Sequence, residues 1–205
     1  MIGVGVTGGI GSGKSTVCRI FRTLLGIPVY DSDANARRIT DEDPEIISQI
    51  INLFGKEAYT QSGTGFEGTI ILDRRFVAGR VFDDPALLGA LNGIIHPAVE
   101  ADFNEWAAGQ QDAPYVIQEA AILFESGAAE KLDAVIAVVA PLELRVERVM
   151  DRDGLTEEEV HRRMANQIYE DELLARADYV IIADGNRPLV PQILEIDKKL
   201  TSRCI

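Results

Sequence analysis

Cysteine, histidine and aromatic residues are scarce in this chain. It contains two cysteines, two histidines and 6% aromatic residues among 205 positions. Cys18 and Cys204 provide neither a disulfide framework nor a zinc-binding spacing, as expected of a protein from a reducing compartment, and we expect Cys18 to be a small core residue. His96 and His161 alone give little support to a histidine-based metal centre.

Positive charge is also in short supply. The chain has 20 lysines and arginines against 33 aspartates and glutamates, a formal net charge of −13 and a pI near 4.6. Such a surface repels nucleic acid and anionic lipid, so neither is an expected partner, and no obligate protein partner is indicated. An anionic ligand would need a local cluster of cations.

Long apolar runs are absent as well. No uninterrupted run reaches the length of a membrane span, and the first residues have the pattern of a core strand rather than of a charged and apolar leader. We therefore expect no membrane segment and a cytoplasmic location. With 46% hydrophobic and 26% charged residues, the composition is that of a globular protein with one core, or one core and a smaller subdomain.

Glycine, by contrast, is frequent near the start of the chain, where residues 8–15 match G-x-x-x-x-G-K-[ST]. The apolar residues 2–7 predict a short buried strand before this motif, and residues 15–25 predict a helix after it. That context indicates a phosphate-binding loop, since glycines let successive N–H groups point into one concavity and the helix adds its positive end. The alternative is a merely structural glycine-rich turn, which the flanking strand and helix disfavour.

The motif predicts the ligands as well as the loop. Lys14 would reach the outer phosphates of a nucleoside triphosphate, and the Ser15 hydroxyl would bind Mg²⁺. ATP and Mg²⁺ are therefore the expected cofactors. The other predicted nucleotide-binding residues are Gly8, Gly9, Gly11, Ser12, Gly13 and Thr16.

Strand-like apolar runs alternate with helical patterns along the chain. Nearly continuous runs of Val, Ile and Ala are typical of parallel strands that are covered on both faces. We predict a three-layer α/β protein with a parallel sheet, a phosphate-binding P-loop, and its ligand at the carboxyl ends of the strands. The predicted strands are residues 2–7, 27–31, 115–119, 133–140 and 178–182.

The gap between the second and third strands is too long for one crossover. We expect residues 34–113 to form an inserted, mostly helical subdomain, and residues 1–33 and 114–205 to form the nucleotide-binding core. Within the insertion, Asp43, Asp73 and Asp84 are predicted helix caps. Residues 60–69, with three glycines, predict a loop.

A further helical region follows the fourth strand. Pro141 opens a helix, Asp153-Gly154 breaks it, and Thr156 with Glu159 forms a capping box for the next helix. This arrangement resembles a mobile lid, at about residues 145–165.

Two aspartates end the second strand and would face the nucleotide crevice. A carboxylate there could accept the proton of an attacking hydroxyl or orient that hydroxyl. The alternative is that one or both aspartates cap the helix that begins near Ala34. We favour Asp33 as the catalytic residue, with Asp31 in support.

Three arginines, Arg145, Arg148 and Arg152, share one face of the helix after Pro141. In an acidic protein they suggest a clamp for the charge of the transferred phosphoryl group, with Arg148 and Arg152 as catalytic candidates. A solvated face with helical ion pairs is the alternative.

The remaining candidates are less specific. Glu119 ends the third strand and is either an outer-shell partner of Mg²⁺ or a structural carboxylate, and Glu125 follows it toward the same crevice. His96 is either an acceptor contact or a packing residue. Arg74 is a candidate for the acceptor phosphates, together with Arg75, Arg37 and Arg38, although solvation explains each of these arginines equally well.

Several of these segments recur together in one known family. They are residues 7–16, Asp31-Ser32-Asp33, Asp73-Arg74-Arg75, Ile95-His96-Pro97, Leu123-Phe124-Glu125 and 148–153. In these segments, which span nearly the full chain, the sequence resembles the dephospho-coenzyme A kinase family. The resemblance implies ATP-dependent phosphorylation of the ribose 3′-hydroxyl of dephospho-coenzyme A, the last step of coenzyme A synthesis. It also implies a P-loop kinase fold in which Asp33 is the general base and the inserted residues 34–113 form the acceptor-binding subdomain.

The sequence departs from the family pattern at a few positions. Ala121 stands where the family usually has proline, Ala183 lies where asparagine is frequent, and Glu119 replaces a frequent aspartate. Two other interpretations stay open. One is another P-loop kinase acting on a nucleoside or nucleoside monophosphate; the other, less favoured, is an ATP-binding regulatory module.

Overall fold

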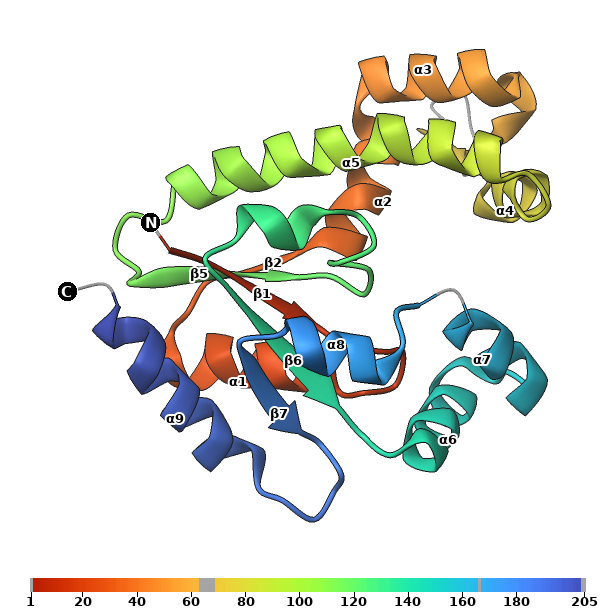
Figure 1. The fold of residues 1–205 in the computed structure, drawn as a ribbon. Coiled ribbons are helices and arrows are strands. Elements are labelled where there is room, and N and C mark those ends of the chain that lie inside the picture. The colour runs from red at the N-terminus through yellow and green to blue at the C-terminus, as the bar shows by residue number, and fades with distance from the viewer. Residues whose placement is uncertain (1, 63–68, 166, 204–205) are drawn as a thin grey trace. The chain divides into compact units, whose positions relative to one another are not determined.

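The computed structural model describes residues 2–62, 69–165 and 167–203 (Figure 1). Cys204 and the three glycines of the predicted loop lie outside these ranges. The chain divides into two compact units, one formed by Met1–Asp31 with Trp106–Ile205 and the other by Ser32–Glu105. Among the described helices, none is long and apolar enough to cross a membrane.

The first unit is built on a five-stranded sheet with the order β2-β5-β1-β6-β7. Each neighbouring pair of these strands is parallel, so the prediction of a parallel sheet is confirmed. The five strands, each of which the sequence predicted, are β1 (Ile2–Thr7), β2 (Val29–Asp31), β5 (Tyr115–Glu119), β6 (Ala134–Val139) and β7 (Tyr179–Ile182).

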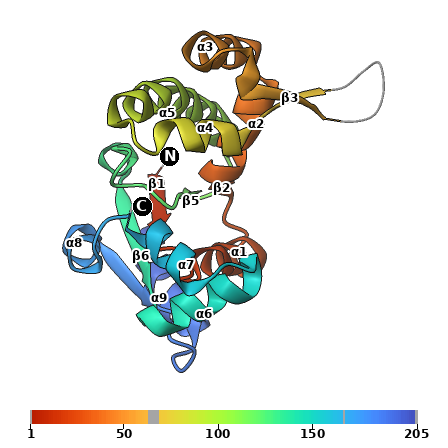
Figure 2. The same cartoon turned by 90° about the vertical axis from the view of Figure 1, so that its right-hand side faces the viewer.

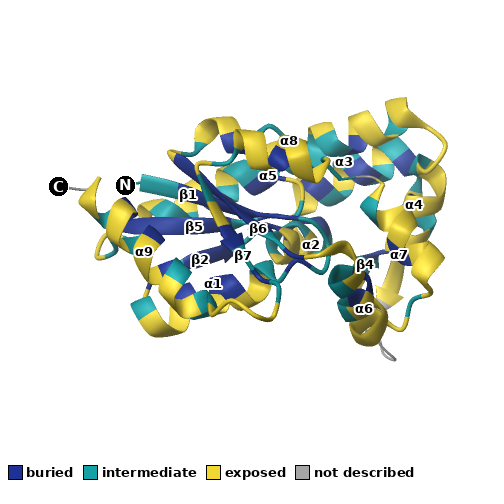
Figure 3. Cartoon of the chain, turned by 60° about the horizontal axis from the view of Figure 1, so that its bottom comes forward, coloured by how far each residue is buried: buried dark blue, intermediate teal, exposed yellow. Residues whose placement is uncertain are grey.

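Helices cover both faces of this sheet. On one face, α1 (Lys14–Leu25) and α9 (Leu189–Ser202) share a hydrophobic cluster with the strands. On the other face, α8 (Glu170–Arg176) packs with the turns that lead into η2 (Ala128–Lys131). The central strands β5, β1 and β6 are therefore buried on both sides (Figure 3), which explains their continuous apolar sequences and confirms the three-layer prediction.

β6 illustrates how one strand serves both layers. Ile136 and Val138 belong to the cluster with α1 and α9, whereas Val135 and Ala137 belong to the cluster with α8. Successive side chains of a strand point to opposite faces, so an unbroken apolar run fills both clusters. Cys18, which is 2% exposed, lies in the α1 cluster and is the core residue that the sequence predicted.

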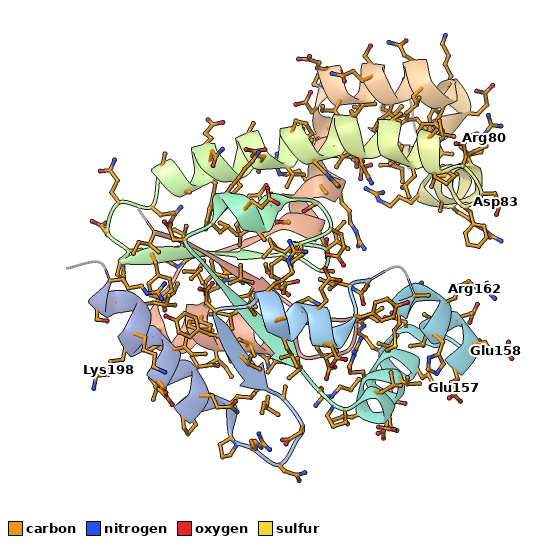
Figure 4. All side chains as sticks on the ribbon, viewed as in Figure 1. Arg80, Asp83, Glu157, Glu158, Arg162 and Lys198 are labelled. Atoms are coloured by element: carbon orange, nitrogen blue, oxygen red, sulfur yellow. The ribbon has the colours of Figure 1, made fainter. Side chains whose placement is uncertain are left out.

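A pair of helices, α6 (Leu142–Asp153) and α7 (Glu157–Met164), follows β6 (Figure 2). Gly154, with φ 66°, ends α6 in the left-handed conformation that favours glycine. The predicted capping box is confirmed, because Thr156 Oγ1 accepts from Glu159 N and Glu159 Oε2 accepts from Thr156 N. Charged side chains of α7 such as Glu158 point outward (Figure 4), so the two helices pack through their apolar faces.

The second unit, Ser32–Glu105, is mostly helical. Asp43 accepts hydrogen bonds from two backbone N–H groups of the helix that follows it, Asp73 does the same, and Asp84 accepts from Leu87 N at 2.9 Å. The three predicted caps are thereby confirmed. The elements of this region are α2 (Ser32–Glu42), α3 (Pro44–Phe54), η1 (Lys56–Ala58), β3 (Tyr59–Ser62), β4 (Thr69–Leu72), α4 (Arg74–Val81) and α5 (Pro85–Ala108), whose last turn belongs to the first unit.

The prediction of a loop at residues 60–69 is wrong at both ends, where the chain forms the strands β3 and β4. β3 and β4 form an antiparallel pair in which Tyr59 lies opposite Leu72 and Gln61 opposite Ile70. The three glycines between the strands dominated the sequence pattern. The β-branched and aromatic residues on either side have the strand preference that decides the structure.

Candidate active site

The phosphate-binding motif forms a tight loop between β1 and α1. Gly11 and Gly13 have φ values of 78° and 100°, a backbone conformation that other residues rarely adopt. Ser12 N donates to Gly9 O at 3.0 Å, which closes the turn. Gly13 is the N-cap of α1 and makes no side-chain cap hydrogen bond, and the positive end of the helix favours an anion at this position.

Two polar side chains of the loop have clear positions. Lys14 Nζ donates to Gly8 O at 2.7 Å and lies back over the loop. Ser12 Oγ is buried, and it has no hydrogen-bond partner among the described residues. Since a buried hydroxyl without a partner is costly, this loop is arranged for a further hydrogen-bonding group.

A carboxylate lies beneath the start of α1. Ser15 Oγ donates to Glu119 Oε1 at 2.8 Å. Glu119 is the last residue of β5, where its register partners are Val6 on β1 and Asp31 on β2. The strand order therefore places Asp31 and Glu119 at the carboxyl ends of two adjacent strands. The phosphate loop leaves β1 at the same end of the sheet.

The surroundings of this site also change the pKa of the Cys18 thiol, one helical turn after Ser15. Burial raises the pKa of the Cys18 thiol well above its ordinary value of 9.0, and the charge of Glu119 raises it further. The thiol is therefore protonated and unreactive at neutral pH.

The residues around Ser15 suit Mg²⁺ held jointly by protein and phosphate. In the part of the chain that the structure describes, no group of three or more His, Cys, Asp and Glu side chains could hold a metal ion by itself. Mg²⁺ is usually held by one or two protein ligands, substrate phosphates and water, rather than by a complete protein cage. Ser15 Oγ with Glu119 as its partner matches that requirement.

Two arginines of α6 contact the phosphate loop. Arg148 donates through Nη1 to Gly11 O at 3.2 Å and through Nη2 to Ala183 O at 2.9 Å. Arg145 Nε donates to Ile10 O at 3.1 Å. Burial lowers the pKa of Arg145 and the nearby Glu170 raises it, but a guanidinium stays charged at neutral pH in either case.

Arg152 has a different environment from the other two arginines. It makes a two-bond ion pair with the next residue, Asp153, at 2.7 and 2.9 Å, and its side chain is 62% exposed. The hydrogen bonds from Arg152 lower the pKa of Asp153. The structure therefore brings both Arg148 and Arg145 to the loop, although the sequence pattern assigned Arg145 no individual role, and it pairs Arg152 within its own helix.

The candidates in the second unit have local partners. Asp33 is exposed in the first turn of α2, which begins at Ser32 rather than near Ala34, so Asp33 is a helical residue and not the N-cap. Arg74 Nη2 donates to Asp41 Oδ2 at 2.8 Å and to Arg37 O at 3.2 Å, joining α4 to α2.

The last two candidates, His96 and Glu125, lie in different units. His96 is half-buried in α5, and burial lowers its pKa, so the imidazole is neutral at pH 7. Glu125 Oε1 accepts from Ile168 N at 2.9 Å. In the first unit, Glu125 therefore holds the backbone that leads into α8.

A parallel sheet with this strand order, a phosphate-binding loop on β1, a serine–carboxylate pair and arginines on the loop define a P-loop kinase. A family model described as "Dephospho-CoA kinase" matches residues 2–188. The chain belongs to the dephospho-CoA kinase family, which confirms the resemblance drawn from the sequence.

Individual relatives agree with this assignment. A dephospho-CoA kinase of Chlorobium luteolum is 45% identical over 183 residues, which is 88% of this chain and 82% of that protein. The crystal structure of a Thermus thermophilus protein is 37% identical, with a TM-score of 0.79 over 98% of this chain and 97% of the other. The structure of dephospho-CoA kinase from Campylobacter jejuni is 26% identical, with a TM-score of 0.65 over 99% and 98% of the two chains.

Proposed function

We propose that this chain transfers the γ-phosphoryl group of ATP to the ribose 3′-hydroxyl of dephospho-coenzyme A, giving coenzyme A and ADP. Family membership over nearly the whole chain supports the acceptor. The observation that carries the phosphoryl chemistry is the hydrogen bond between Ser15 and Glu119 at the base of the phosphate loop. A serine of the phosphate loop and a nearby carboxylate hold the metal ion in other P-loop enzymes, which supports a metal site at this pair.

The loop residues would bind the donor. The N–H groups of Gly11 and of residues 13–15 would surround the β-phosphate, and Ser12 Oγ is a buried group suited to gain a hydrogen bond on binding. Lys14 would exchange the carbonyl oxygens of Gly8 and Gly9 for phosphate oxygens, a movement that its flexible stem allows. Mg²⁺, when bound through Ser15 with Glu119 in its outer shell, would neutralise charge on the two outer phosphates.

The arginines and Asp33 would act on the transferred group and on its acceptor. Arg148 already donates to the loop, and its guanidinium would stabilise the charge that builds on the phosphoryl oxygens during in-line transfer. Arg152 would join it after leaving Asp153. Asp33 would hold the 3′-hydroxyl and accept its proton, which fits an exposed carboxylate in the first turn of a helix.

We further propose that residues 34–113 form the acceptor-binding subdomain and that α6 and α7 form the lid, at about residues 145–165. Arg74, His96 and Glu125 are the candidate contacts for dephospho-coenzyme A. Binding through Arg74 would compete with its bonds to Asp41 and Arg37, and binding through Glu125 would compete with its bond to Ile168 N.

An acceptor screen tests this function. The protein is incubated with ATP and Mg²⁺ and one of dephospho-coenzyme A, AMP, CMP or uridine, and ADP release is measured. We expect release with dephospho-coenzyme A alone, and phosphorus NMR should place the new phosphate on the 3′-oxygen. Release with a nucleoside or a nucleoside monophosphate, and none with dephospho-coenzyme A, would refute the proposal in favour of another small-molecule kinase.

A further inference from the structure

Ile10, at the outer turn of the phosphate loop, is held through its side chain and both of its backbone groups. Its side chain packs against the cluster of Val146, Val149 and Val160 between α6 and α7. Its carbonyl oxygen accepts from Arg145 Nε at 3.1 Å, and its N–H donates to Gln167 Oε1 at 2.8 Å. These partners lie more than 130 residues away in sequence, within the helix pair and just after it.

Gln167 is the partner to which neither the sequence motifs nor the proposed chemistry gave a role. Its side chain is half-buried between the phosphate loop and the turn that follows β5. Oε1 accepts from Ile10 N, and Nε2 donates to Ala121 O at 3.3 Å. Only one orientation of the amide satisfies both neighbours, since a peptide N–H requires the oxygen and a carbonyl requires the NH₂ group.

The residues next to Gln167 keep it in place. Ile168 N donates to Glu125 Oε1 at 2.9 Å, and Glu170 Oε2 lies 3.6 Å from an Nη of Arg145. Arg145 in turn stands so close to Gly9 that a Cβ atom added there would collide with the guanidinium. Residues 167–170 thus support the loop directly through Gln167 and indirectly through Arg145.

A loop rich in glycine has many accessible conformations and needs such support. Binding a polyphosphate requires several N–H groups to converge, and any freedom that the loop has before binding is lost on binding and weakens affinity. The hydrogen bond from Ile10 N to Gln167 restricts the loop before any nucleotide binds.

We infer that Gln167 is a positioning residue for the nucleotide: it fixes Ile10, and through Ile10 the phosphate loop, against the base of the α6–α7 pair. This inference rests on the proposed function, because the loop is that of the proposed ATP site. Gln167 thereby sets the affinity for ATP from outside the phosphate-binding motif and without contacting dephospho-coenzyme A.

The test compares Gln167→Ala with Asp178→Ala. Asp178 is a matched control, because its Oδ2 accepts from Val135 N at the same 2.8 Å, in the same unit, at the end of the sheet remote from the phosphate loop. Amide hydrogen exchange is followed by NMR, MgADP affinity by calorimetry, and KM for ATP and for dephospho-coenzyme A by ADP release.

In Gln167→Ala we expect the Ile10 amide to exchange at least about tenfold faster, and the MgADP Kd and the KM for ATP to rise about five- to tenfold, the scale of one hydrogen bond. The KM for dephospho-coenzyme A should stay unchanged. Asp178→Ala should speed exchange at Val135 and leave both KM values alone. Gln167→Glu, which keeps an oxygen for Ile10 N, should restore the protection of that amide.

The inference would be overturned if Gln167→Ala left either the exchange rate of the Ile10 amide or the MgADP affinity unchanged. It would also be overturned if both KM values rose equally in Gln167→Ala and in Asp178→Ala. Exchange and calorimetry need no acceptor. If the unmodified protein failed to phosphorylate dephospho-coenzyme A, the proposed function would fail while Gln167 could still be judged.

Discussion

Replacing Arg148 by alanine separates the two roles that its position allows. The guanidinium joins Gly11 O to Ala183 O and so links the phosphate loop to the end of β7. We also propose that it stabilises the transferred phosphoryl group. The first role concerns the stability of the fold, and the second concerns the transition state.

The structural role has a bounded magnitude. Two hydrogen bonds from a charged donor to backbone carbonyls stabilise by about 1.5 kcal/mol each at the low end of the usual range, and Arg148 is only half-buried, so the loss should be about 1–3 kcal/mol. In a protein of this size each kcal/mol shifts Tm by about 2–4 °C. Arg148→Ala should therefore lower Tm by about 2–12 °C, still leaving a folded protein at 25 °C.

The catalytic role predicts a much larger effect on turnover. Removing a group that stabilises developing charge usually lowers kcat by about a hundredfold or more, equivalent to about 2.7 kcal/mol. We expect this loss in steady-state ADP release at saturating ATP and dephospho-coenzyme A, measured at 25 °C where the variant is folded.

Arg22→Ala is the control for this experiment. Arg22 Nη2 donates to Val29 O at 3.1 Å, so its removal also costs a hydrogen bond from a guanidinium to a backbone carbonyl, but at the last turn of α1. It should lower Tm with kcat unchanged. If Arg148→Ala lost less than about tenfold in kcat while its Tm fell, Arg148 would be a structural link only, and the proposed clamp would be wrong.

Three further predictions concern Asp33, Glu119 and Cys18. Asp33→Asn should lower kcat by at least about a hundredfold with calorimetric ADP affinity retained, and near-normal turnover would remove Asp33 from the mechanism. Glu119→Gln should raise the Mg²⁺ concentration for half-maximal activity by about 10–100-fold, as loss of an outer-shell carboxylate does, and an unchanged Mg²⁺ titration would contradict the placement at Ser15. The pKa of Cys18 is higher in the folded chain than its ordinary value of 9.0, so only the unfolded chain loses this proton above pH 9, and the contribution of Cys18 to stability should fall by up to about 1.4 kcal/mol per pH unit there. Melting curves at pH 8 and 10 should show a smaller decline in Cys18→Ala than in the unmodified protein, and equal declines would refute the assignment.

Local sequence signals predicted much of the architecture. The strands of the sheet, the caps at Asp43, Asp73 and Asp84, and the capping box at Thr156 all depend on residues within a few positions of one another. The prediction of a loop failed at β3 and β4, because the glycines between them predict a loop more strongly than the strand residues predict strands.

In the candidate site, too, local sequence determined some features and the docking of helices determined others. The sequence by itself determined the phosphate loop, since the glycines, Lys14 and Ser15 are contiguous and their spacing specifies the backbone geometry. It also determined that three arginines share one face of α6. It contained no information on which of them contacts the loop, because that depends on how the whole helix docks.

Only the tertiary structure decided the remaining contacts. Glu119 meets Ser15 because β5 pairs with β1 in the sheet, and Ile10 meets Gln167 because α6 and α7 return the chain to the phosphate loop. Such contacts join residues separated by more than a hundred positions. Their physical cause is the packing of strands and helices against a shared core, which no local pattern of residues records.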